Sequence, residues 1–140
     1  MNPYEKYQQQ MVTTMTQGEM LLLLYDEVLK QIDVAKAAME TKDVAAMDKA
    51  IAKAEKIIRY LRAQLDFRYP VSKDLSKLYD FFNTQLVMAN VKKDPQHLND
   101  IQPLIRELRE TFDQCAKLDR QNRLGTKGNT AVAGPVGNVV

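Results

Sequence analysis

Apolar residues recur every three or four positions along most of the chain, and no stretch alternates convincingly between apolar and polar residues. This spacing gathers the apolar side chains on one face of an α-helix. It predicts four long helices, over about residues 17–40, 44–67, 73–92 and 95–123. Because the connections between them are short, sequential helices should be antiparallel neighbours. The prediction is an all-α protein, an antiparallel up-down four-helix bundle over residues 16–123.

Polar residues mark where each helix should begin. Thr16 followed by Glu19 is a capping-box signature, and Asp43 is a good N-cap for the second helix. Ser72 is expected to cap the third helix, and Asp94 the fourth.

Proline 103 leaves the form of the fourth helix open. If the helix starts at Pro95, Pro103 falls inside it and should kink it. In the other reading, the main helix starts at Asp100 and Pro103 lies in its first turn.

Each predicted helix has an apolar seam that should form the core. The seams are Leu21, Leu24, Val28, Ile32, Ala35 and Met39; Met47, Ile51, Ala54, Ile58, Leu61 and Leu65; Leu75, Phe82, Leu86 and Ala89; and Leu98, Ile101, Ile105, Leu108, Phe112 and Cys115. The tripeptide Leu-Tyr-Asp occurs twice, at 24–26 and 78–80. In both copies the leucine and tyrosine straddle the seam and the aspartate points away. The repeat is therefore predicted to be a core feature on two parallel helices.

Some apolar residues lie off the seams, on second stripes: Leu22, Leu29, Ile57, Phe81, Met88 and Leu104. Two interpretations compete. Either these residues widen the core or seal it under the N-terminal segment, or they line a groove for an amphipathic partner helix.

The two ends of the chain differ from the bundle. Residues 1–15 are polar with three apolar anchors, Tyr4, Tyr7 and Met11, and are predicted to lie over a groove as a displaceable latch. Residues 124–140 hold four of the five glycines and are predicted to be disordered.

Composition excludes several classes of function. Among 140 residues the net charge is +2, with 20 basic and 18 acidic residues closely mixed, which argues against a nucleic-acid surface. His97 is the single histidine and Cys115 the single cysteine, so no zinc pattern or di-iron motif is present. We therefore expect no metal, no cofactor and no enzymatic activity, and a buried, inert thiol. No secretory signal or membrane-spanning run is evident, which favours the cytoplasm.

Four segments in order resemble one known family. The opening NPYEKYQQ is similar to the NPYxxYQQ start of the FliS family, and TMTQGEMLLLLYD to its entry into the first long helix. LYDFFNTQLVMANVKKD and ELRETFDQC resemble two further hallmarks of that family. The likeness covers nearly the whole chain. Gln17 replaces a common proline, Phe112 replaces a tryptophan and should still fill a core site, and FRYPVS stands where many members have paired glycines.

The resemblance implies a cytoplasmic export chaperone for flagellin. Such a protein binds the C-terminal segment of flagellin in apolar grooves, prevents premature polymerisation and delivers it to the flagellar export apparatus, sometimes as a homodimer. The alternative is a helical adaptor or structural protein that uses the same apolar stripes to dimerise.

Overall fold

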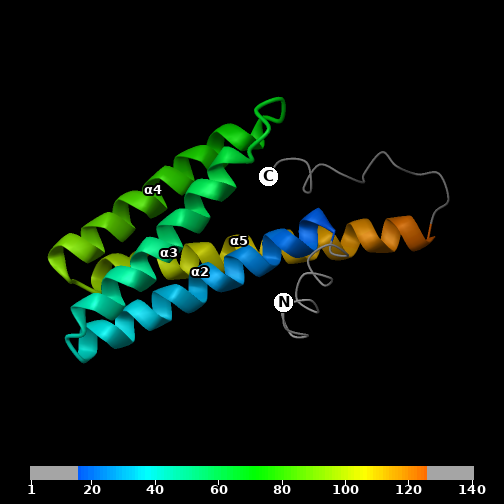
Figure 1. Cartoon of the computed structure of the whole chain (residues 1–140). Helices are drawn as coiled ribbons and strands as arrows, with labels where there is room; N and C mark the ends of the chain where they lie inside the picture. The colour runs from blue at the N-terminus through cyan, green and yellow to red at the C-terminus, as the bar shows by residue number, and fades with distance from the viewer. Residues whose placement is uncertain (1–15, 126–140) are drawn as a thin grey trace, which may run out of the picture.

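The chain folds into a ring of four antiparallel helices in a computed structural model that describes residues 16–125 (Figure 1). The helices are α2 (Gln17–Glu40), α3 (Val44–Ala63), α4 (Val71–Lys92) and α5 (Gln96–Gly125). Helix α2 packs against α3 and α5, and α4 packs against the same two helices. The predicted four-helix bundle is confirmed. The N-terminal latch and most of the predicted disordered tail lie outside the described residues.

The two halves of the ring are not parallel along their whole length. In Figure 1, α3 and α4 diverge from α2 and α5 toward the end where α2 begins. Helix α5 is the longest, at 30 residues, and runs on past the start of α2. Within residues 16–125, no helix combines the length and the apolarity that a membrane span requires.

The core follows the predicted seams closely. All six residues of the second predicted seam are buried, and the last of them, Leu65, lies just beyond the end of α3. In α2, Tyr25 is fully buried whereas its neighbour Leu24 is only partly so. Phe112 is buried and its ring stacks on Tyr25 at a centroid distance of 5.6 Å, so phenylalanine does fill the expected core site. Cys115 is half-buried rather than enclosed.

The repeated Leu-Tyr-Asp is a core feature through its tyrosines, as predicted, and it also forms a link across the bundle that the sequence did not indicate. Tyr25 and Tyr79 are both fully buried, and their hydroxyl oxygens lie 2.5 Å apart. Asp26 and Asp80 point outward, where they accept hydrogen bonds from Arg109 of α5 and Arg62 of α3. Each copy therefore ties its helix both to the core and to a neighbouring helix.

The capping residues of α2 and α3 act as the sequence indicates. The Thr16 hydroxyl accepts the Glu19 N–H at 3.1 Å, and the Glu19 carboxylate accepts the Thr16 N–H at 3.4 Å. Asp43 Oδ1 accepts the Ala46 N–H at 3.1 Å. These bonds satisfy backbone donors that the first helical turn leaves unpaired.

Two predicted boundaries need correction. Helix α3 ends at Ala63 and not at Phe67, although Leu65 beyond it is still buried. Ser72 does not cap α4, which begins one residue earlier at Val71; the Ser72 hydroxyl instead donates back to the Asp66 carbonyl at 2.6 Å.

Helix α5 settles the question that Pro103 raised. It begins at Gln96, whose N–H is accepted by Asp94 Oδ1 at 2.9 Å, and continues unbroken past Pro103. The alternative prediction, that the main helix starts at Asp100, is therefore wrong.

Candidate binding cleft between α4 and α5

A cleft of about 310 Å³ lies between α4 and α5. Four of its six lining residues are apolar, and the other two are polar residues of α5: Leu78, Phe82, Leu104, Leu108, Glu107 and Thr111. Phe82 is fully buried, while Leu78 and Leu108 are partly buried against the core. Leu104 is 36% exposed. An apolar surface beside polar groups is the usual form of a site for an amphipathic helix.

The sizes of the interhelical side chains explain why the cleft opens here. The buried residues of α2 and α3 include the small Ala35, Ala38 and Ala50, and the contact between these two helices is the most extensive in the ring. Helices α4 and α5 meet through phenylalanine and leucine, and their contact is the least extensive. Because larger side chains hold helix axes further apart, this edge of the bundle is left partly open.

Three of the predicted groove residues lie on this edge. Gln85 Oε1 and His97 Nδ1 form a hydrogen bond of 2.8 Å that joins α4 to α5. Phe81 and Met88 lie four residues before and three after Gln85, so they share its α5-facing side of α4. Phe81 is 41% exposed and its ring packs beside that of Phe82 at 6.2 Å. Phe81 and Met88 extend the apolar surface of the cleft, which Leu104 already lines.

The structure places Leu22 and Leu29 elsewhere. They flank Asp26, whose carboxylate accepts a hydrogen bond from Arg109 at 2.9 Å, and so lie at the α2/α5 edge. Both are partly buried against the core, as expected for residues that seal this interface.

Ile57 lies on a third edge of the bundle. It is four residues after Lys53, which pairs with Glu27 of α2 at 3.2 Å, so it faces α2 and not the cleft. The six predicted groove residues therefore do not form one surface. The three predicted latch residues, Tyr4, Tyr7 and Met11, lie outside the described part of the chain.

Sequence reasoning missed several residues that line the cleft. Leu78, Phe82 and Leu108 were assigned to the core, which they do contact, and Thr111 was not singled out. One available signal was the spacing of Leu104, Leu108 and Thr111, which are four and three residues apart and so form a single stripe on α5.

The buried tyrosines beside the cleft are neutral. Burial raises the pKa of Tyr79 to about 12. Burial, reinforced by the adjoining Tyr79 hydroxyl, raises the pKa of Tyr25 well above its usual value. At neutral pH neither hydroxyl loses its proton, which fits a structural role. Between residues 16 and 125, no group of three or more metal-ligating side chains comes together.

The fold and the cleft define a helical bundle with an apolar edge of the kind that takes a partner helix. A family model described as "Flagellar protein FliS" matches residues 1–119. The flagellar secretion chaperone FliS of Bacillus subtilis is 34% identical over 127 residues, which cover 91% of this chain and 96% of that protein. FliS of Vibrio cholerae is 34% identical over 94 residues, covering 66% of this chain and 69% of that protein. The chain belongs to the FliS family of flagellar secretion chaperones.

Proposed function

We propose that this chaperone binds the C-terminal segment of flagellin in the cytoplasm, with an amphipathic helix of that segment lying along the α4/α5 cleft. The observation that carries the proposal is the partly open apolar cleft, which Leu104 lines and which Phe81 and Met88 extend. A segment that forms coiled coil in the assembled filament presents apolar stripes, and these stripes need a temporary partner before assembly.

The exposed anchors give moderate binding energy. Fully burying a leucine or phenylalanine side chain is worth about 1.5–3 kcal/mol. Phe81 and Leu104 are 41% and 36% exposed, so covering the rest of each contributes roughly 1 kcal/mol. Ordering a flexible client offsets part of this gain. Tight binding of the flagellin segment therefore needs several such contacts. Because each contact is weak, the segment can still be released to the export apparatus. The role is binding, which requires no catalytic step.

The test is calorimetric titration of the protein with about the last 50 residues of the cognate flagellin, a span of several heptads. Phe81→Asp and Leu104→Asp should each weaken binding at least tenfold, because they put a charge into an apolar contact. Val87→Asp is the matched control, since Val87 is also on α4 and is 46% exposed, but lies seven residues after Asp80 and so on the side of α4 that faces α3. Absence of binding by the unaltered protein would refute the function. Equal weakening by all three variants would refute the site.

We also propose that residues 1–15 act as a latch through Tyr4, Tyr7 and Met11. Three apolar anchors, set against the entropy of ordering the segment, give only marginal docking. Deletion of residues 1–15 should leave the helical content unchanged and speed client association in stopped-flow measurements. Unfolding of the truncated protein would show instead that the segment is part of the core.

The alternative is an adaptor that uses the exposed apolar stripes to dimerise. The exposed part of the Phe81 side chain could pack against a flagellin helix or against a second copy of this chain. Light scattering separates them: a tight dimer that persists in Phe81→Asp, with unchanged client binding, would rule out the cleft as the binding site of either partner.

A further inference from the structure

Charge is divided unevenly among the helices of the bundle. Helix α3 carries five basic and two acidic residues, whereas α2 carries two basic and five acidic ones. The overall charge of +2 conceals this separation. A basic helix beside an acidic one produces a local field that a small net charge does not indicate.

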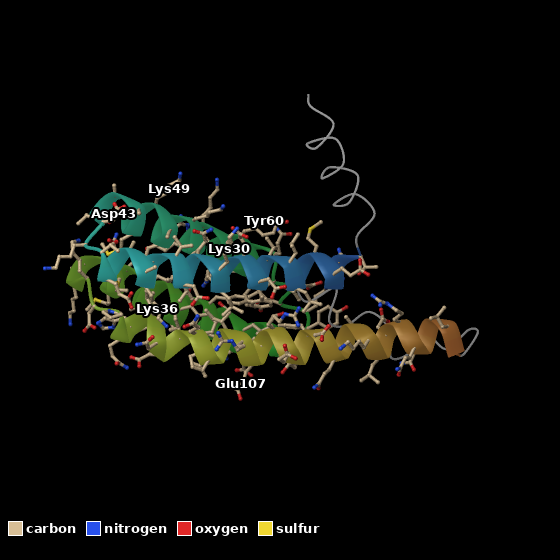
Figure 2. The ribbon with its side chains drawn as sticks, turned by 90° about the horizontal axis from the view of Figure 1, so that it is seen from below. Lys30, Lys36, Asp43, Lys49, Tyr60 and Glu107 are labelled. Carbon is tan, nitrogen blue, oxygen red and sulfur yellow. The ribbon has the colours of Figure 1, made fainter. Side chains whose placement is uncertain are left out.

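Three of the five basic residues of α3 form a strip on its outer face, whereas Arg59 and Arg62 pair with Glu55 and Asp80. Lys49, Lys53 and Lys56 are four and three residues apart, and Tyr60 follows four residues later on the same stripe. All three lysines are exposed, and Tyr60 is 47% exposed. In Figure 2, Lys49 and Tyr60 lie along α3, with Lys30 on the neighbouring α2, while Glu107 projects from α5 at the opposite edge. We call Lys49, Lys53, Lys56 and Tyr60 the α3 strip.

Little in the bundle neutralises the α3 strip. Lys53 pairs with Glu27 at 3.2 Å. Lys49 and Lys56 have no ion-pair partner among residues 16–125, and neither does Lys30. A hydrogen bond from Gln31, together with Lys53 and Lys30, holds the pKa of Glu27 below its usual value, as expected for a carboxylate beside excess positive charge.

We propose that the α3 strip docks an acidic amphipathic helix of a partner protein. Three lysines in line match carboxylates spaced four and three along a helix that runs beside α3. Tyr60, at one end, adds an aromatic anchor of the kind that is enriched at interfaces. This surface is separate from the α4/α5 cleft, so the proposal does not depend on the client assigned to that cleft.

The width of the α3 strip favours a helix over an anionic membrane. Glu27 of α2 borders it on one side. On the other side stand Asp48 and Glu55, on the face of α3 from which Arg62 reaches Asp80 of α4. Asp48 is exposed, whereas Glu55 pairs with Arg59 at 3.7 Å. A flat lipid surface would meet the carboxylates of Glu27 and Asp48 together with the lysines, whereas a helix with one line of carboxylates matches the single line of lysines.

The test uses a synthetic helical peptide of about 18 residues, which covers the roughly 17 Å from Lys49 to Tyr60. It carries glutamates spaced four and three on one face. A control peptide has the same composition with the glutamates spread around the helix. Binding to the full-length protein is followed by fluorescence anisotropy at low and high salt, and vesicles of phosphatidylglycerol and phosphatidylcholine are tested in parallel.

The expected result is salt-sensitive binding of the striped peptide and weaker binding of the control peptide. An exposed ion pair changes affinity by about 1.4- to 5-fold, so Lys49→Glu/Lys56→Glu should weaken binding about tenfold. Lys73→Glu/Lys77→Glu on α4 makes the same charge change and should have less than a twofold effect. Leu104→Asp should bind the peptide normally, which keeps this site distinct from the cleft.

Three outcomes would overturn the proposal. They are equal binding of both peptides, equal loss in the two double variants, and binding to vesicles without binding to the striped peptide. Lys49, Lys56, Lys73 and Lys77 are all exposed, so both double variants should fold normally. Circular dichroism of each variant checks that the bundle is folded.

Discussion

Replacement of Tyr79 by phenylalanine removes one hydroxyl from a pair that is closed off from solvent. Tyr25 and Tyr79 have no exposed surface, and their hydroxyl oxygens are 2.5 Å apart. In Tyr79→Phe the Tyr25 hydroxyl stays buried without this partner, which costs about 1–3 kcal/mol of stability. Tyr25→Phe should cost a similar amount for the same reason.

The double variant distinguishes a lost hydrogen bond from a lost contact. With both hydroxyls replaced, no polar group is left unpaired at this position, so Tyr25→Phe/Tyr79→Phe should be nearly as stable as the unaltered protein. It should therefore be more stable than either single variant. Tyr60→Phe is the control, because its hydroxyl belongs to a half-exposed residue and its loss should change stability by less than about 0.5 kcal/mol.

The assay is urea unfolding followed by far-ultraviolet circular dichroism. The midpoint should fall in the single variants without a change in slope, since the same surface is exposed on unfolding. In a thermal scan, each 1 kcal/mol lost should lower Tm by roughly 4 °C. Additive losses in the double variant would refute the reasoning, as would single variants indistinguishable from the unaltered protein.

Three further predictions follow from the same core and its caps. Because burial raises the pKa of both tyrosines above the ordinary value of 10.0, the unfolded chain loses these protons first. The free energy of unfolding should not change below about pH 10, and above it should fall by up to about 1.4 kcal/mol per pH unit for each tyrosine. Urea titrations at several pH values should show this fall in the unaltered protein and not in Tyr25→Phe/Tyr79→Phe. Thr16→Ala removes the capping box of α2 and should cost about 1 kcal/mol, seen as a lower Tm and faster amide exchange near Glu19. Phe112→Ala empties a buried site beside Tyr25 and should cost about 3–5 kcal/mol in urea unfolding; a loss below 1 kcal/mol would contradict the observed packing.

The helices could be predicted because their periodicity is strict and most of their ends carry polar caps. The second seam repeats at three and four residues, and this spacing alone predicts all six of its buried positions. The end of α3 was placed too late, at Phe67, because Leu65 continues the apolar spacing beyond the last helical residue. A buried residue in a turn cannot be told from one in a helix by periodicity alone.

The site was harder to predict than the fold. A helical wheel shows that Leu22, Ile57 and Phe81 lie off their seams, but it does not show which neighbouring helix each one faces. That depends on the arrangement of the ring and on side-chain size, which close the α2/α3 edge and leave the α4/α5 edge partly open. Residues such as Leu78 and Leu108 contact the core and also line the cleft. A scheme that assigns each apolar residue either to a core seam or to a second stripe therefore overlooks their role in the cleft.

The most direct test of the binding cleft is methyl nuclear magnetic resonance of the chaperone during titration with the C-terminal segment of flagellin. The account predicts that the methyl signals of Leu78, Met88, Leu104 and Leu108 shift most, and that those of Leu29 stay close to their free positions. Shifts concentrated at Leu29, with the four cleft residues unchanged, would contradict it.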